Sequence, residues 1–150
     1  MEQIAVTSKL YFYLEGKTTL NEIGAFGAQN VDKVFEEAQK AGLEKAGPLE
    51  FIYFDASGDK DKEFVLHIAL PVKEKKQAPQ GFHYRQTTRF KCLKEQHKGP
   101  ISELGEVYDS IFEYVWNHSL KTTNEIREVY HAFEHPNSID NLTEIQVGLN

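Results

Sequence analysis

The feature that most constrains this chain is an internal duplication. When the 150-residue sequence is shifted along itself by 77 residues, its two halves align without a gap and Tyr53 falls on Tyr130. Two units are too few for a solenoid, which needs about three repeats to bury a continuous core. We therefore predict a single domain over residues 1–150 with pseudo-twofold symmetry. Its repeats cover about residues 9–72 and 86–149.

Each half predicts a strand, a helix and two further strands. In the first half, the apolar and aromatic run Lys9–Glu15 is typical of a strand. Asn30 is the expected N-cap of a helix that has an apolar stripe and ends at Gly42. Two strands are then predicted at Leu49–Asp55 and Glu63–Val72.

The second half repeats this plan. Arg89–His97 is predicted to be a strand, and Ser102 is the expected N-cap of the second helix. Strands follow at Glu125–Phe133 and Leu142–Leu149. The polar stretch Lys73–Gly81 joins the two halves, so each unit has the order β-α-β-β.

Composition and charge exclude several classes of partner. The net charge is −6 and the signs are interspersed, so we expect no nucleic-acid surface, which needs clustered Lys and Arg. No signal peptide and no apolar stretch of membrane-spanning length is present, which predicts no membrane contact. A lone cysteine, Cys92, excludes an intrachain disulfide and fits a cytoplasmic location.

No motif predicts a metal or a cofactor. The run His131–His135 matches H-x-x-E-H, which binds zinc only on a helix. Here it follows a strand signal and meets Pro136, and the residue before a proline disfavours a helix. We therefore expect neither a metal nor a cofactor.

Strand alternation assigns residues to the two faces of the predicted sheet. One strongly apolar row of the last strand is expected beneath the helices; it comprises Thr143, Ile145, Val147 and Leu149. Val129 and Ile52 are assigned to the same helix-covered face. The opposite face then brings four polar residues together near the seam between the halves: Glu144, His67, Tyr130 and Tyr53. Such a seam favours a ligand pocket.

Three segments of the second half resemble the GyrI-like effector-binding family of the SOUL superfamily. They are Lys98–Leu104, Arg127–Tyr130 and Thr143–Val147, in that order. The sequence departs from the family pattern at Ile101, where relatives carry an aromatic residue after Gly-Pro. It departs again at His67, where relatives often carry an acidic one.

The resemblance implies an α+β fold with a curved antiparallel sheet, helices on one side and a central ligand cleft. It also implies that Glu144 matches a last-strand glutamate that contacts cationic or polar ligands among aromatic rings. Many relatives carry a helix-turn-helix region in front of this domain. Since the first unit begins within about ten residues of Met1, we expect a bacterial effector-binding domain of the transcription-regulation or multidrug-binding type, without its own DNA-binding region.

A carboxylate in a partly dry aromatic cleft attracts a cation, because burial disfavours the unpaired charge and aromatic faces attract cations. We therefore predict that the partner is a small hydrophobic or cationic molecule. The candidate ligand-binding residues are Glu144, Tyr130, Tyr53, His67, Trp116, Phe112, Tyr108, Tyr11 and Tyr13.

Two alternatives to simple binding stay open. In the first, the protein is a hydrolase that detoxifies strained, cyclopropane-containing electrophiles, with Glu144 and Tyr130 as acid–base partners. In the second, it is an interaction protein similar to a gyrase inhibitor, with a protein partner or a second copy of itself on its surface. The sequence does not decide whether the protein is an enzyme.

Overall fold

Six of the eight strands and both helices follow the duplicated sequence. The computed structural model describes residues 1–150 and is α+β. Its elements are β1 (Glu2–Val6), β2 (Leu10–Thr18), α1 (Ile23–Lys40), β3 (Glu50–Phe54), β4 (Phe64–Pro71), β5 (Phe82–Gln86), β6 (Phe90–Lys98), the 3₁₀ turn η1 (Ile101–Glu103), α2 (Leu104–Asn117), β7 (Thr122–Ala132) and β8 (Leu142–Leu149). The predicted order of each unit is confirmed, and the polar link between the units contains no strand before residue 82.

One antiparallel sheet holds all eight strands in the order β1-β6-β8-β7-β3-β4-β2-β5. The central pair, β7 and β3, contains one strand from each half, so the pseudo-twofold seam runs between them. Across the seam, Phe51 lies opposite Glu128 and Ile52 lies opposite Arg127. Phe51 and Glu128 are equivalent positions of the two repeats, so the pseudo-twofold axis passes between these two residues.

The two edge strands are exchanged between the halves. Strand β1 precedes the first unit but pairs with β6 of the second, whereas β5 precedes the second unit and pairs with β2 of the first. Neither strand was predicted, because each precedes the first predicted strand of its unit.

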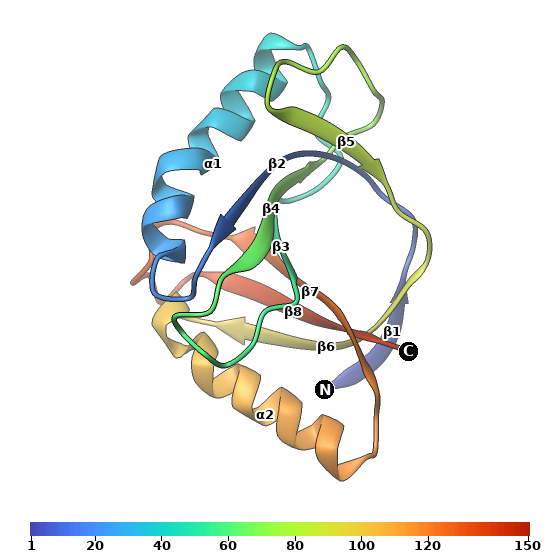
Figure 1. Ribbon diagram of the computed structural model, residues 1–150, viewed down its shortest axis with the longest axis vertical. Coiled ribbons are helices and arrows are strands. Elements are labelled where there is room, and N and C mark those ends of the chain that lie inside the picture. The colour runs from blue at the N-terminus through green and yellow to red at the C-terminus, as the bar shows by residue number, and fades with distance from the viewer.

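This exchange forces the sheet to curl. The link from Val6 to Leu10 spans at most about 14 Å, whereas the strands that it joins stand six positions apart, about 29 Å along a flat sheet. The two exchanged links meet at Lys9 and Thr87, where the backbone N–H of each residue donates to the other over 2.8 Å, to Oγ1 of Thr87 and to the carbonyl of Lys9. In Figure 1 the strands accordingly close into an arc on the side away from the helices.

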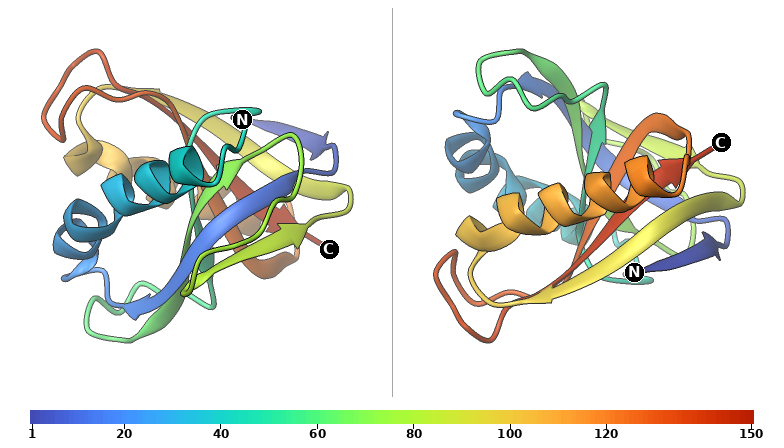
Figure 2. Two further views of the ribbon diagram at one scale, coloured as in Figure 1. Left: turned by 90° about the horizontal axis from the view of Figure 1, so that it is seen from above. Right: turned by 90° about the horizontal axis from the view of Figure 1, so that it is seen from below.

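Both helices cover the same side of the sheet (Figures 1 and 2). Helix α1 packs on the apolar row of the first half through Val34 and Ala38, and the row comprises Leu66, Ile68, Leu70 and Val72. Helix α2 packs through Leu104 and Ile111 on the corresponding row of the second half: Ile145, Val147 and Leu149. The predicted position of the last-strand row beneath a helix is confirmed. Neither helix combines the length and apolar composition that a bilayer span requires.

The predicted helix starts are wrong. Helix α1 begins at Ile23, and Asn30 lies in its middle, where its side-chain amide donates to the carbonyl of Phe26 over 2.8 Å. Ser102 lies within η1, and α2 begins at Leu104 without a side-chain cap. The expected end of the first helix is confirmed, since Gly42 has a φ of 72°, a conformation that favours glycine.

A glycine in the last strand lets β7 approach closely. A methyl group at Gly148 would overlap Oγ1 of Thr123 and come within 2.9 Å of the backbone carbonyl of Glu125. The backbone atom cannot move aside as a flexible side chain could. The register between β7 and β8 is also irregular between Thr122 and Ile126, next to this contact.

We expect Gly148→Ala to lower the free energy of unfolding by about 1–3 kcal/mol, because overpacking forces the strands apart. Gly105→Ala on α2 is the control, since nothing lies within 4 Å of its added methyl group; its stability should stay unchanged or rise by up to about 1 kcal/mol. Urea unfolding of both variants measures the difference. Equal stabilities would contradict the close approach.

Candidate ligand-binding site

The expected convergence of Glu144 and His67 with the two seam tyrosines is wrong. Tyr53 pairs with Leu66 and Tyr130 pairs with Thr143, and both partners belong to helix-covered rows. Glu144 instead pairs with Val129 and, like His67, lies on the other face. The sheet therefore separates the tyrosines from Glu144.

The assignment of residues to the two faces of the sheet failed because both faces of the curled sheet are buried. Ile52, expected beneath a helix, forms a second core cluster with Tyr11 and Ala69 on the face without helices. Apolar β-branched residues thus point to both sides of the sheet. Alternation alone could not assign Val129 to the face without helices, nor its neighbour Glu128 to the helix side.

Glu128 is the centre of a polar cluster beneath the helices. Its carboxylate is 4% exposed and accepts three tyrosine hydroxyl hydrogen bonds. Tyr53 donates to Oε1 over 2.8 Å, Tyr130 donates to Oε1 over 2.6 Å, and Tyr108 donates to Oε2. We call these four residues the Glu128–tyrosine cluster.

The duplication builds this cluster asymmetrically. Tyr53 and Tyr130 are equivalent in the two repeats and reach the same carboxylate from β3 and β7, and Tyr108 reaches it from α2. The repeat equivalent of Glu128 is Phe51, whose ring packs beneath α1 near Gly27. The seam therefore carries one buried charge and not two.

The charge of Glu128 has no basic partner. No Lys, Arg or His forms an ion pair with it, and its only side-chain donors are the three hydroxyls. Burial raises the pKa of this carboxyl above its ordinary value, and the hydrogen bonds from the tyrosines offset part of that rise. Burial and the nearby carboxylate raise the pKa of each tyrosine well above its ordinary value, so the hydroxyls stay protonated donors.

Aromatic rings extend the cluster to the surface. Phe51 meets the ring of Tyr130 edge-on with centroids 5.2 Å apart, and Phe133 lies 6.2 Å from the same ring. Phe112 stacks on Tyr108 at 6.5 Å. Phe112 is 42% exposed and Phe133 is 50% exposed, so solvent reaches the outer edge of this aromatic lining.

Among the residues predicted to bind a ligand, Tyr53, Tyr130 and Tyr108 surround Glu128, and Phe112 lies against Tyr108. Trp116 is 85% exposed, one turn farther along α2, and forms no aromatic pair. It stands outside the hydrogen-bonded cluster.

Glu144 already has protein partners on the opposite face. Glu144 is 8% exposed, and its carboxylate accepts hydrogen bonds from Gln146 over 2.6 Å and from Gln96 over 3.3 Å. Nε2 of His131 lies 3.1 Å from it. Burial acts to raise the pKa of Glu144, but these neighbours hold it below its ordinary value. A carboxylate with such partners has less need of a cationic guest than Glu128.

The remaining predicted residues also lie on the face without helices. His67 stacks on Tyr13 with centroids 4.1 Å apart and contacts Glu15 through Nε2 at 2.8 Å. Burial lowers the pKa of His67 despite that carboxylate. Tyr11 is buried and donates to Glu50 over 2.8 Å.

The sequence did contain a signal for Glu128. Residues two apart in a strand share a face, so Glu128 and Tyr130 had to point together. Both belong to the segment Arg127–Tyr130 that carries the family resemblance. Placing Tyr130 on the wrong face concealed this pairing.

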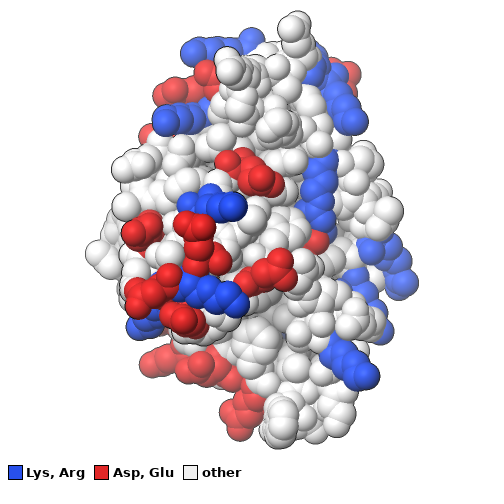
Figure 3. Space-filling view, in the orientation of Figure 1, with Lys and Arg blue, Asp and Glu red and all other residues white.

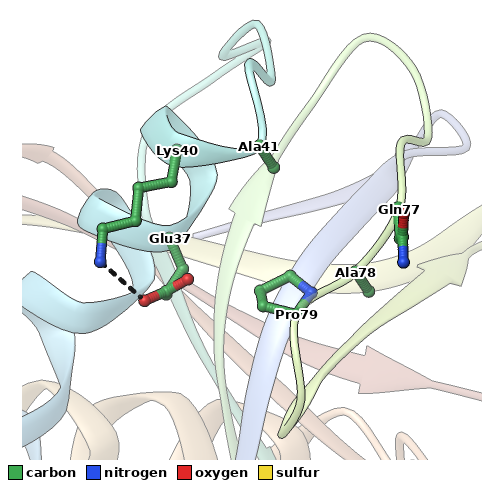
Figure 4. Close-up of a pocket in the computed structure, with 6 residues that line it drawn as sticks. All are labelled: Glu37, Lys40, Ala41, Gln77, Ala78 and Pro79. Atoms are coloured by element: carbon green, nitrogen blue, oxygen red, sulfur yellow. Dashed lines mark hydrogen bonds and ion pairs between the residues drawn. The ribbon is translucent and has the colours of Figure 1, made fainter.

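A separate hollow of about 350 Å³ lies between the end of α1 and the link that follows β4 (Figure 4). Glu37 and Lys40, which pair at 3.4 Å, line one side, and Gln77 and Pro79 line the other. None of the residues in the Glu128–tyrosine cluster contributes to it, and its charged groups are already paired. It lacks the buried, unpaired charge that distinguishes Glu128.

Comparison with known families and structures matches the chain over almost its whole length. A family profile described as GyrI-like small molecule binding domain matches residues 2–150. Comparison with curated proteins gives no significant match.

Among solved structures, the EcmrR C-terminal domain has a TM-score of 0.86 at 17% identity, over 99% of this chain and 96% of that one. The alignment with EcmrR in its complex with DNA covers 99% of this chain but only 56% of the EcmrR chain. SAV2435 bound to tetraphenylphosphonium has a TM-score of 0.71 at 13% identity, over 100% and 94% of the two chains. A hydrolase from Listeria innocua has a TM-score of 0.61 at 12% identity, over 99% and 91%. These likenesses show a shared fold.

The raised pKa of Glu128 predicts a pH dependence of stability. A carboxyl whose pKa is raised by folding stabilises the protein most below its ordinary pKa, and this contribution is lost as the pH rises through the raised value. We expect the free energy of unfolding of the wild type to fall relative to that of Glu128→Gln as the pH rises from about 4.5, by at most about 1.4 kcal/mol per pH unit. Urea unfolding of both proteins between pH 4 and 9 measures this difference. A free energy of unfolding of the wild type that stays constant or rises with pH relative to that of Glu128→Gln would contradict the assignment.

Proposed function

Since this chain belongs to the GyrI-like small-molecule binding domains, we propose that it binds hydrophobic organic cations at the Glu128–tyrosine cluster. One observation carries the proposal: Glu128 is 4% exposed, lies among aromatic rings and forms no ion pair. A buried carboxylate without a neighbouring cation is unfavourable, and a cationic ligand supplies the positive charge that the protein lacks there.

The energetics favour a lipophilic cation over a neutral or anionic molecule. An arriving cation restores the preference of Glu128 for its charged form, so part of the cost of burial is recovered on binding. Aromatic faces add roughly 0.5–2 kcal/mol each where they lie against the cation. A neutral ligand gains only apolar contact, and an anion is repelled by the carboxylate.

Access to Glu128 runs past α2. Tyr108 is the one cluster residue on a helix, and its hydroxyl covers Oε2 of the carboxylate. A ligand that reaches the carboxylate therefore displaces this hydroxyl or shifts the helix that carries it. The exposed ring of Phe112, one turn along α2, forms the outer contact surface on this path.

This displacement suits an effector-sensing role. Movement of α2 would convert ligand binding into a change of surface shape that another domain, a protein partner or a second copy of the chain could read. The EcmrR C-terminal domain shares this fold and belongs to a protein solved on DNA. Regulation of transcription by this chain is part of the proposal and would act through such a partner.

Glu128 and Glu144, which are buried on opposite faces of the sheet, allow a matched test with tetraphenylphosphonium as the probe. We expect isothermal titration calorimetry to detect saturable binding to the wild-type protein at pH 8. Glu128→Gln should weaken it at least tenfold, about 1.4 kcal/mol, because the counter-charge is lost. Glu144→Gln, a similarly buried carboxylate on the opposite face, should change the affinity less than twofold.

The same titration at lower pH adds a second readout. Affinity should fall toward pH 5 as Glu128 takes up a proton. Equal losses in the two variants, or a loss in Glu144→Gln alone, would refute the assignment of the site to Glu128.

A second candidate function is hydrolysis of a strained electrophile at the same cluster. The observation that favours it is the direct contact between Tyr108 and a carboxyl with a raised pKa. The oxygen of a water would bond to one ring carbon as the strained carbon–carbon bond breaks, with Glu128 accepting the proton of the water. A tyrosine hydroxyl would protonate the released carbon, and the proton on Glu128 would then return to the tyrosine that it contacts.

Product counting distinguishes the two functions. If the protein is a hydrolase, incubation with a cyclopropane-containing electrophile should form many equivalents of ring-opened product, and Glu128→Gln should abolish turnover. Chromatography with mass detection measures the product per mole of protein. One equivalent or less would reject hydrolysis and leave binding as the function.

A further inference from the structure

A second hollow, of about 230 Å³, opens on the face of the sheet opposite the helices. It lies beside the link between β5 and β6, and its lining is strongly polar. The residues that characterise it are Arg85, Thr87, Thr88, Arg89, Glu125 and Arg127. Three guanidinium groups and one carboxylate leave this hollow with a local charge of plus two, in a protein whose net charge is −6.

Arg127 is built into the wall of this hollow. It is 1% exposed, and its guanidinium lies 3.7 Å from the ring centroid of Phe90. Nε donates to Glu125 over 2.6 Å, which is its only hydrogen bond to a protein side chain. Nη1 is buried and has no hydrogen-bond partner. Burial of a guanidinium that has one donor paired and another without a partner destabilises the fold, so a structural role alone does not explain Arg127.

Arg85 repeats this arrangement from β5. Its Nη2 donates to the other carboxylate oxygen of Glu125 over 2.8 Å, and its Nη1 is also buried without a partner. Glu125 therefore bridges the two guanidinium groups and fixes their orientation while using one donor of each. Burial acts to raise the pKa of Glu125, but both arginines hold it below its ordinary value, so the bridge stays charged.

The remaining donors match an oxyanion. Arginine forks bind the oxygen atoms of phosphates and carboxylates in a fixed geometry, and buried donors without partners favour a ligand that accepts from them. Arg89 lies exposed at the rim, and Thr88 is exposed beside it. On the face seen in Figure 3, the side of the curled strands shows several Lys and Arg but few Asp and Glu side chains, whereas elsewhere on this face the two signs are mixed.

We propose that this hollow is a phosphate-binding site formed by Arg85 and Arg127, with Arg89 at its rim. A phosphate carries nearly two negative charges at neutral pH and three acceptor oxygens, which matches the local charge and the free donors. A single carboxylate would neutralise only half of that charge. The phosphate is either inorganic phosphate or the phosphate group of a small metabolite.

This site is independent of the proposed cation site. Arg127 and Glu128 are neighbours in β7, so their side chains point to opposite faces of the sheet. Arg127 lies opposite Ile52 and Gln146, whereas Glu128 lies opposite Phe51 and Ile145. Loss of phosphate binding and loss of cation binding can therefore be measured separately.

Calorimetric titration of the full chain with inorganic phosphate tests the site, at low chloride because exposed charges are screened by salt. We expect saturable binding to the wild type, weakened at least tenfold in Arg85→Gln. The control is Lys33→Gln, which removes the same charge from the exposed surface of α1 and should leave the affinity within twofold. Both variants should bind tetraphenylphosphonium as the wild type does.

Arg89→Gln supplies a second variant, because an exposed rim residue can be replaced without disturbing the core. It should weaken phosphate binding at least threefold with an unchanged melting temperature. Titration with phenyl phosphate identifies the source: tighter binding than inorganic phosphate indicates a phosphorylated metabolite, and weaker binding indicates the free ion. Absence of saturable phosphate binding, tighter binding of acetate than of phosphate, or equal losses in Lys33→Gln and Arg85→Gln would each overturn the proposal.

Discussion

The curl of the sheet, and with it the burial of both sheet faces, follows from the exchange of the two edge strands between the halves. A link of three residues must join strands that stand six positions apart in the sheet, so a flat arrangement is excluded. The sheet curls until Lys9 and Thr87 meet. Curling encloses the face that carries no helix, and residues such as Tyr11 and Ile52 become as deeply buried there as the rows beneath α1 and α2.

Burial of both faces gives this small domain two separate polar interiors. On the helix side, Glu128 has tyrosine hydroxyls but no cation. On the other side, Arg127 and Arg85 share Glu125 and retain unpaired donors. The first interior carries an excess negative charge and the second an excess positive charge, and the thickness of the sheet separates them. The protein thereby keeps a negative and a positive polar cluster apart without a second domain.

The duplication explains why the helix-side site lies where it does. A twofold seam brings equivalent residues together, so Tyr53 and Tyr130 reach one carboxylate from both sides. Divergence of the two repeats then breaks the symmetry, since Phe51 occupies the position equivalent to Glu128. Two glutamates opposite each other across the seam would repel, whereas one glutamate against a phenylalanine leaves a single charge in an apolar setting.

The repeat, the order of elements in each unit and the apolar row of the last strand could be predicted from the sequence, because they depend on local periodicity and on the 77-residue register. It identified three of the four residues of the Glu128–tyrosine cluster as candidates, namely Tyr53, Tyr108 and Tyr130, but named Glu144 as the carboxylate. The tertiary structure shows that these tyrosines contact Glu128 and not Glu144. The physical reason is that alternation fixes which residues point together but does not say which face is which, once the exchanged edge strands curl the sheet and bury both faces.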